Sequence, residues 1–162
     1  MTNKKILMSA CLLGKRVRYD GKRLKVTDQK LQNWVDRGWI VSVCPEVDAG
    51  MNIPRVSAEI SNGDGYKVLL GEASVKTKVG DDVSDFFLRG ATIALELCLK
   101  YDIKVAVLSE SSPSCGSSTI YNGQFSASKI SGVGVTTALL KNNGIQVFNQ
   151  FNFLNAFEEA EK

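Results

Sequence analysis

Three of the four cysteines follow short apolar runs whose pattern predicts β-strands. They are Cys11, Cys44 and Cys115, which come after residues 5–10, 39–43 and 104–108. In an open parallel α/β sheet, ligands bind outside the carboxyl ends of the strands. The three thiols could therefore converge there, although they lie far apart in sequence. Three convergent thiolates suit a metal or an iron–sulfur cluster with one open coordination position.

The chain contains no histidine. Ser-His-Asp and Cys-His catalysis are therefore excluded, and so is the commonest ligand of catalytic zinc. A metal bound here must use thiolates and oxygens. Thiolate-rich sites favour iron–sulfur clusters or zinc.

Length and composition predict one soluble globular domain spanning residues 1–162, because the chain has 162 residues, 44% of them hydrophobic and 23% charged. The net charge of +3 is too mild to indicate nucleic acid, but it is compatible with a polar or anionic small substrate. The sequence predicts neither a membrane span nor a secretory signal, so we expect a cytoplasmic protein. Cysteines in that compartment are more often catalytic or metal-binding than disulfide-bonded.

Strands alternate with helices, which predicts an α/β fold: a single-domain Rossmann-like parallel sheet with flanking helices. Expected strands cover residues 5–10, 39–43, 104–108 and 145–148. Expected helices cover residues 28–38, 82–100 and 134–143, followed by a short C-terminal helix. Within the helix over 82–100, the residues assigned to the apolar face are Phe86, Ala91, Leu95 and Leu99.

The regions between these elements carry turn signals. The run Ser61-Asn62-Gly63-Asp64-Gly65 predicts a small β-hairpin insertion that pairs residues 58–60 with residues 66–70. Residues 45–65 otherwise read as irregular. The Ser- and Gly-rich segment 109–131 reads as a long loop, and a loop of that length inside a compact domain is usually functional.

Seven short segments occur along the chain in one order. They are Ser9-Ala10-Cys11-Leu12-Leu13-Gly14, Arg18-Tyr19-Asp20-Gly21, Cys44-Pro45-Glu46, Pro54-Arg55 with Glu59, Ser112-Pro113-Ser114-Cys115-Gly116-Ser117, Ile120-Tyr121-Asn122-Gly123-Gln124-Phe125 and Gly132-Val133-Gly134-Val135-Thr136. Together they resemble the bacterial thiouracil desulfidase family, long known only as a domain of unknown function. The resemblance covers nearly the whole chain.

The resemblance implies a chemistry. It implies a [4Fe–4S] cluster held by Cys11, Cys44 and Cys115, whose fourth iron is open to the sulfur of a thiocarbonyl substrate. The activity expected is hydrolytic desulfuration, without net redox change, of a thiolated nucleobase such as 2-thiouracil or of a related nucleoside. Sulfur would leave as hydrosulfide.

The resemblance also implies residue roles. Glu46 matches the catalytic acid/base, and a serine of the Ser-Pro-Ser-Cys segment matches a second catalytic group, with Ser112 the first choice and Ser114 the second. Arg18, Asp20 and Arg55 are candidates for substrate binding. The chain differs from many members of the family at two positions, where it has Val17 instead of cysteine and Ser109 instead of lysine.

Simpler interpretations stand beside these roles. Cys98, inside a predicted helix, is expected to be a small buried hydrophobe. Arg55 and Glu59 could pair and brace their loop, Asp20 could bond its own turn, and Glu46 could be a solvated carboxylate or a partner of a helix N-terminus.

Two further segments invite a binding interpretation. The basic run Lys15, Arg16, Arg18, Lys22 and Arg23 is most simply a solvated loop, with a bound phosphate as the alternative. Residues 132–136 could hold an anion at a helix N-terminus, but a tight turn that lets the helix pack closely is the simpler interpretation.

Three rival functions remain open from sequence. One is a zinc hydrolase with three thiolate ligands. Another is a non-enzymatic module that binds an iron–sulfur cluster or sulfur. Thiol redox chemistry ranks last because the chain has no Cys-x-x-Cys motif.

Overall fold

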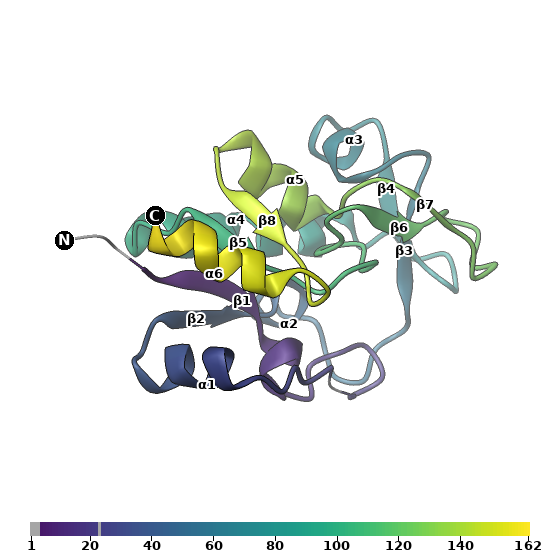
Figure 1. Ribbon diagram of the computed structural model, residues 1–162. Coiled ribbons are helices and arrows are strands. Elements are labelled where there is room, and N and C mark those ends of the chain that lie inside the picture. The colour runs from purple at the N-terminus through teal and green to yellow at the C-terminus, as the bar shows by residue number, and fades with distance from the viewer. Residues whose placement is uncertain (1–3, 23) are drawn as a thin grey trace.

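A four-stranded parallel sheet forms the centre of the molecule. The computed structural model describes residues 4–22 and 24–162 (Figure 1). The strands are β1 (Ile6–Ser9), β2 (Ile40–Val43), β5 (Val105–Val107) and β8 (Gln146–Phe148), in the spatial order β2-β1-β5-β8. All three pairings are parallel, and β1 and β5 are buried along their whole length. The predicted Rossmann-like α/β fold is confirmed.

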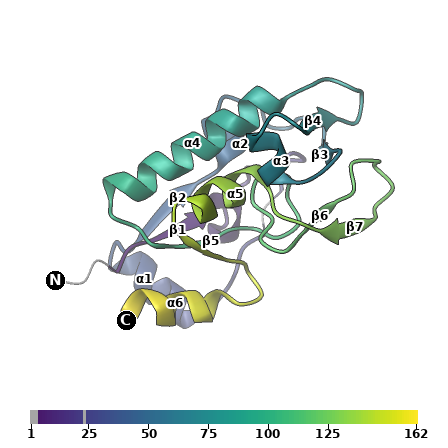
Figure 2. The same cartoon turned by 90° about the horizontal axis from the view of Figure 1, so that it is seen from above.

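Helices cover both faces of this sheet, as Figures 1 and 2 show. The helices α1 (Gln29–Asp36) and α6 (Phe153–Glu161) pack on one face, and α4 (Ser84–Lys100) and α5 (Val135–Asn142) on the other. Side chains of β1 alternate between the two layers, with Ile6 and Met8 on the α1/α6 side and Leu7 on the α4/α5 side. A sheet covered on both faces needs such continuously apolar strands.

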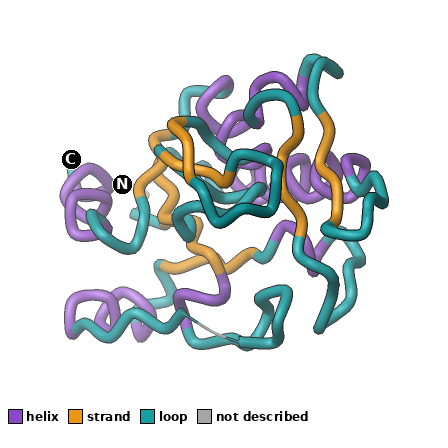
Figure 3. Tube along the Cα trace, turned by 90° about the vertical axis from the view of Figure 1, so that its right-hand side faces the viewer, coloured by secondary structure: helices purple, strands orange, loops and turns teal. Residues whose placement is uncertain are grey.

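Two small hairpins stand beyond one end of the sheet. They are β3 (Ala58–Ser61) with β4 (Ser74–Thr77), and β6 (Thr119–Tyr121) with β7 (Lys129–Ser131), both antiparallel. Figure 3 views the molecule from their side. Three short helical segments lie between the larger elements: η1 (Ala10–Leu13), α2 (Pro45–Asp48) and α3 (Gly65–Leu69).

The sequence predicted the first hairpin, but with the wrong second strand. The partner of β3 is β4, and the residues expected there form α3 instead. The Asp64 carboxylate accepts hydrogen bonds from the N–H groups of Tyr66 and Lys67, at 3.1 and 3.4 Å, and so caps the helix. A short apolar run fits helix and strand equally well, so this local cap decides the outcome.

The apolar face of α4 was also predicted with an error. Phe86 and Leu99 are 37% and 69% exposed, whereas the neighbouring Phe87 and Cys98 are buried. The buried residues on this helix are Phe87, Gly90, Ala91, Ala94 and Cys98. The predicted and the observed apolar faces are shifted by about one residue along the helix, and both contain Ala91. The expectation that Cys98 is a buried hydrophobe is confirmed.

Two segments that read as irregular contain regular structure. Residues 45–65 include α2 as well as the predicted strand, and residues 109–131 include the hairpin β6–β7. These elements have only three or four residues each. Such short pieces give too few residues for a periodic pattern to be recognised.

Candidate active site: three thiols and an ion-paired carboxylate in one cavity

The three predicted thiols lie on one cavity at the carboxyl edge of the sheet. Cys11 is in η1, directly after β1, and Cys44 directly precedes α2, at the end of β2. Cys115 lies in the loop after β5, and β1 lies between β2 and β5. A cavity of about 520 Å³ is lined by all three cysteines. Adjacent parallel strands end at the same edge, so sequence-distant thiols become neighbours there.

Burial keeps these thiols protonated when no cation is present. Removal from water raises the pKa of Cys11, raises that of Cys44 to about 11, and raises that of Cys115 to about 12. Nearby charge on the Cys11 and Cys44 sulfurs raises the pKa of Cys115 further. Three thiolates together therefore need a cationic group between them, and binding it must release protons.

The donor set fits an iron–sulfur cluster better than a single metal ion. Soft sulfur ligands without imidazole suit iron–sulfur clusters or zinc. Within residues 4–22 and 24–162, however, no group of three or more His, Cys, Asp or Glu side chains could hold one metal ion. A cluster offers a separate iron to each thiolate, so its ligands need not meet at one point. This geometry gives the zinc alternative no support.

Glu46 is held by a buried ion pair. Its Oε1 accepts from Arg55 Nε and Nη2, both at 3.2 Å, and the two side chains are 17% and 7% exposed. Arg55 also donates to the carbonyls of Asn52 and Val17, each at 3.1 Å. The guanidinium therefore fixes the direction of the Glu46 carboxylate. Glu46 is thus not a freely solvated carboxylate, and it lies in the first turn of α2.

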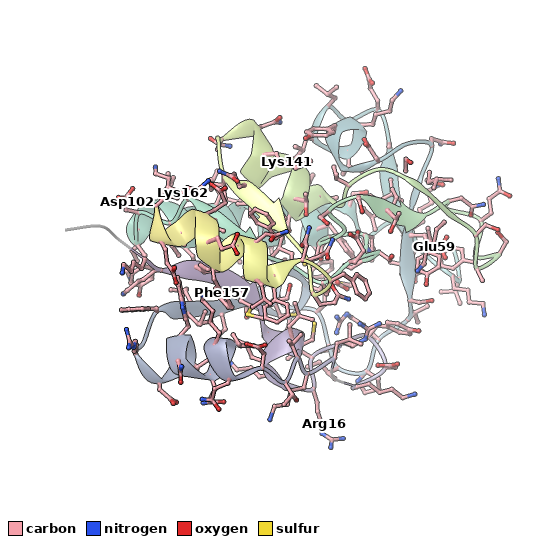
Figure 4. All side chains as sticks on the ribbon, in the orientation of Figure 1. Arg16, Glu59, Asp102, Lys141, Phe157 and Lys162 are labelled. Atoms are coloured by element: carbon pink, nitrogen blue, oxygen red, sulfur yellow. The ribbon has the colours of Figure 1, made fainter. Side chains whose placement is uncertain are left out.

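The alternative pairing of Arg55 with Glu59 is wrong. Glu59 instead accepts hydrogen bonds from the N–H groups of Gly123 and Phe125, at 2.9 and 3.2 Å. Figure 4 labels Glu59 among the hairpins. Its carboxylate therefore joins the first hairpin to the loop of the second.

Two serine hydroxyls connect the cavity to Glu46. Ser112 Oγ lies 3.2 Å from Ser114 Oγ, and Ser114 donates to Glu46 Oε2 at 3.3 Å. Ser114 is fully buried and also lies 3.4 Å from Cys115 Sγ, whereas Ser112 is half-buried; both residues line the cavity. The two predicted serines thus form one chain of hydroxyls, in which Ser112 is the more accessible end and Ser114 the link.

The N-terminus of α5 fixes the loop that carries Cys115. The first N–H groups of this helix lack partners within it, and here Val135 donates to the Pro113 carbonyl at 2.9 Å and Thr136 to the Ser114 carbonyl at 2.8 Å. A Cβ on Gly134 would lie 2.4 Å from the Ser114 carbonyl carbon, so only glycine fits there. This close contact supports the tight-turn interpretation of residues 132–136.

Glu110 anchors the other half of that loop, and sequence reasoning missed it. Its carboxylate accepts hydrogen bonds from Ser117 Oγ at 2.7 Å, Thr119 N–H at 3.1 Å and Asn149 Nδ2 at 2.7 Å, among others. Although burial opposes the charge, hydrogen bonds from Ser117 and from the Ser118 and Thr119 backbone lower the pKa of Glu110 to about 2. One sequence feature could have identified Glu110: it is a single carboxylate just before a run of serines, and the backbone N–H groups of such a run need acceptors.

The predicted substrate-binding residues divide between the cavity and the surface. Arg18 and Arg55 line the cavity. The charge of Arg18 lowers the pKa of Cys11 in part, although burial raises it more. Asp20 is exposed, and its carboxylate accepts the N–H of Lys22 at 2.9 Å, so the structure gives it the turn-stabilising role.

The basic run does not form one patch on the cavity. Lys15 Nζ donates to Ser42 Oγ at 3.0 Å, and Arg16 is exposed and points away from the molecule (Figure 4). The prediction for Arg23 falls outside the described residues. Of this run, only Arg18 is described as part of the cavity wall.

The outer wall of the cavity is aromatic and basic, and sequence reasoning assigned its side chains no role. It includes Tyr121 and Phe125 from the second hairpin and its loop, Lys78 just after β4, and Phe151 just after β8. Phe151 is 81% exposed at this position. The cavity thus combines a thiol-lined inner end with rings suited to a planar ligand.

Comparison with known proteins identifies relatives over nearly the full length. The model of the 2-thiouracil desulfurase family matches residues 6–152. The uncharacterized protein YbbK of Bacillus subtilis (strain 168) is 43% identical over 150 residues, which cover 93% of this chain and 97% of YbbK. A solved structure of the [4Fe-4S]-dependent thiouracil desulfidase TudS is 41% identical, covers 97% of both chains and superposes with a TM-score of 0.88. None of the described helices is long and apolar enough to cross a membrane.

Proposed function

This chain belongs to the 2-thiouracil desulfurase family, and we propose that it is a [4Fe–4S]-dependent desulfidase that releases sulfur from thiouracil as hydrosulfide. The similarity to TudS supports the activity and the cofactor. The observation that carries the proposal is the convergence of three thiols and an ion-paired carboxylate on one cavity. The family predicted from the seven sequence segments is confirmed.

Cys11, Cys44 and Cys115 would hold the cluster as thiolates. When bound by three protein thiolates, the cluster supplies a Lewis-acidic iron with one position open to a substrate sulfur. Arg18 lies on the same cavity and adds positive charge near Cys11, which favours the thiolate. Cys11 and Cys115 are buried, which strengthens the electrostatic interactions at their sulfurs.

Glu46 serves as the general base in this proposal. Its carboxylate takes a proton from a water that attacks the thiocarbonyl carbon, and it returns the proton as sulfur leaves. Arg55 contacts Oε1, which leaves Oε2 facing Ser114. The Ser112–Ser114 pair gives a path for a proton between the cavity and Oε2, with Ser112 at the substrate end.

The substrate would lie between the thiols and the outer wall. A planar thiolated nucleobase fits the space beside Tyr121 and Phe125, and a nucleoside would extend toward the hairpins. Arg55 forms an ion pair with Glu46. It therefore positions the general base Glu46 rather than the substrate. We also expect the chain to act as one domain in the cytoplasm, where thiols are kept reduced and so remain available as ligands.

The test is anaerobic reconstitution with iron and sulfide, followed by analysis of bound iron and acid-labile sulfide. We expect about four of each per chain, and conversion of 2-thiouracil to uracil with release of hydrosulfide. A protein that binds zinc but no sulfide would point to a hydrolase with a single metal ion. A loaded protein without turnover would point to a carrier or sensing module.

A further inference from the structure

The three proposed ligands differ in the hydroxyl groups around them. Ser9 Oγ donates to Cys115 Sγ at 3.7 Å. Burial raises the pKa of the Cys11 thiol, and a hydrogen bond with the Ser109 side chain opposes that rise. In the described part of the chain no side-chain hydroxyl bonds to Cys44, whose Sγ lies 3.9 Å from the Val17 carbonyl. Two of the three thiols therefore have a serine donor and one does not.

These two contacts cross between neighbouring strands. Ser9 ends β1 and precedes Cys11 by two residues, yet its hydroxyl reaches Cys115 in the loop after β5. Ser109 follows β5 and lines the same cavity as Cys11, whose pKa its side-chain hydrogen bond lowers in part although burial raises it more. The two serines are 3% and 6% exposed, so their hydroxyls are removed from competing water. These contacts connect the segment after β1, which carries Cys11, with the loop after β5, which carries Cys115.

The hydrogen-bond pattern assigns the Ser9 proton to sulfur. Ser9 Oγ accepts the Ser109 N–H at 3.0 Å, which leaves its only proton for Cys115 Sγ. Ser114 also contacts Cys115, but its hydroxyl donates to Glu46 Oε2 as well. Ser9 is thus a dedicated donor to the sulfur, whereas Ser114 can change partners.

We propose that Ser9 and Ser109 are positioning residues that stabilise the thiolates of Cys115 and Cys11 by crossed hydrogen bonds and thereby set the reduction potential and retention of the cluster. The inference rests on the proposed function, because it assumes that these thiolates are ligands. Hydrogen bonds to cluster sulfurs favour the more negatively charged, reduced state and raise the reduction potential. Partners of metal ligands also commonly strengthen metal binding by about 10–100-fold.

The experiment compares Ser9→Ala and Ser109→Ala with a matched control, Ser42→Ala. Ser42 precedes Cys44 by two residues, as Ser9 precedes Cys11, but its hydroxyl accepts from Lys15 instead of contacting a thiol. Each reconstituted protein is analysed for iron and sulfide, titrated anaerobically to obtain the reduction potential, and mixed with a chelator to follow iron loss.

We expect all variants to bind the full cluster, because all three thiolates remain. Ser9→Ala and Ser109→Ala should each show a more negative potential and iron loss faster by about tenfold or more. The double variant should show a larger shift than either single change, since each serine serves a different thiolate. Ser42→Ala should match the unmodified chain.

Thermal unfolding distinguishes a variant that is misfolded from a folded variant whose cluster has a changed reduction potential. A variant with an unchanged melting temperature and an unchanged potential would overturn the inference while leaving the desulfidase proposal intact. A shift of equal size in Ser42→Ala would also overturn it, because the effect would then not depend on contact with a thiol. If the unmodified chain bound no cluster, both proposals would fail.

Discussion

Two buried cysteines show what distinguishes the candidate site from the core. Cys98 and Cys115 are 1% and 4% exposed, and burial raises the pKa of each to about 12. Both belong to the same apolar cluster, but Cys115 also has the Ser9 and Ser114 hydroxyls and two other thiols beside it. Burial alone therefore does not identify a ligand. The difference is the set of donors and thiols that surround the sulfur.

The largest effect should separate these two cysteines directly. Cys115→Ala removes a ligand from the cavity, so we expect cluster uptake to be abolished, as measured by iron and sulfide per chain. Cys98→Ala should retain full uptake and turnover and should lower only stability, because it leaves a small cavity in the core. Full cluster uptake by Cys115→Ala would contradict the assignment of Cys115 as a ligand and, with it, the distinction from Cys98.

The next effect concerns the carboxylate rather than the sulfurs. Glu46→Gln keeps the shape of the side chain but removes the proton acceptor, so we expect a loaded cluster with turnover reduced by about 10²–10⁴-fold. Anaerobic assays of hydrosulfide release measure this loss. Glu72→Gln, at an exposed position, is the matched control and should be fully active. Normal turnover by Glu46→Gln would remove this residue from the mechanism.

A smaller effect should rank the two serines. Ser112→Ala and Ser114→Ala each interrupt the hydroxyl chain to Glu46, and we expect turnover to fall by about tenfold or more in both. Ser112 is the more accessible end, so its loss should also raise KM, whereas loss of the fully buried Ser114 should lower kcat alone. The same KM change in both variants would contradict this order.

The sequence predicted the positions that follow the central strands much better than the cavity wall. Cys11 and Cys44 come directly after apolar strands whose order and direction follow from the alternation of strands and helices, so their convergence could be inferred. Phe125 and Tyr121 reach the cavity through a hairpin with strands of three residues, which has no recognisable period. Arg55 pairs with Glu46 and not with Glu59. This choice depends on the direction that the chain takes after α2, and no local sequence pattern encodes that direction.

The smallest effect tests the loop around Cys115 through acid stability. The pKa of Glu110 is lowered from the usual 4.5 to about 2, so the folded chain binds fewer protons there than the unfolded chain. The resulting stabilisation is fully present above about pH 5 and is lost as the pH falls toward 2. Glu110→Gln lacks this stabilisation. The difference in the free energy of unfolding between this variant and the unmodified chain should therefore shrink as the pH is lowered. Urea unfolding of both proteins without added iron, from about pH 7 to about pH 3, measures the difference. Glu158→Gln, exposed on α6, is the control, and an equal deficit at every pH would exclude the carboxylate charge as the cause.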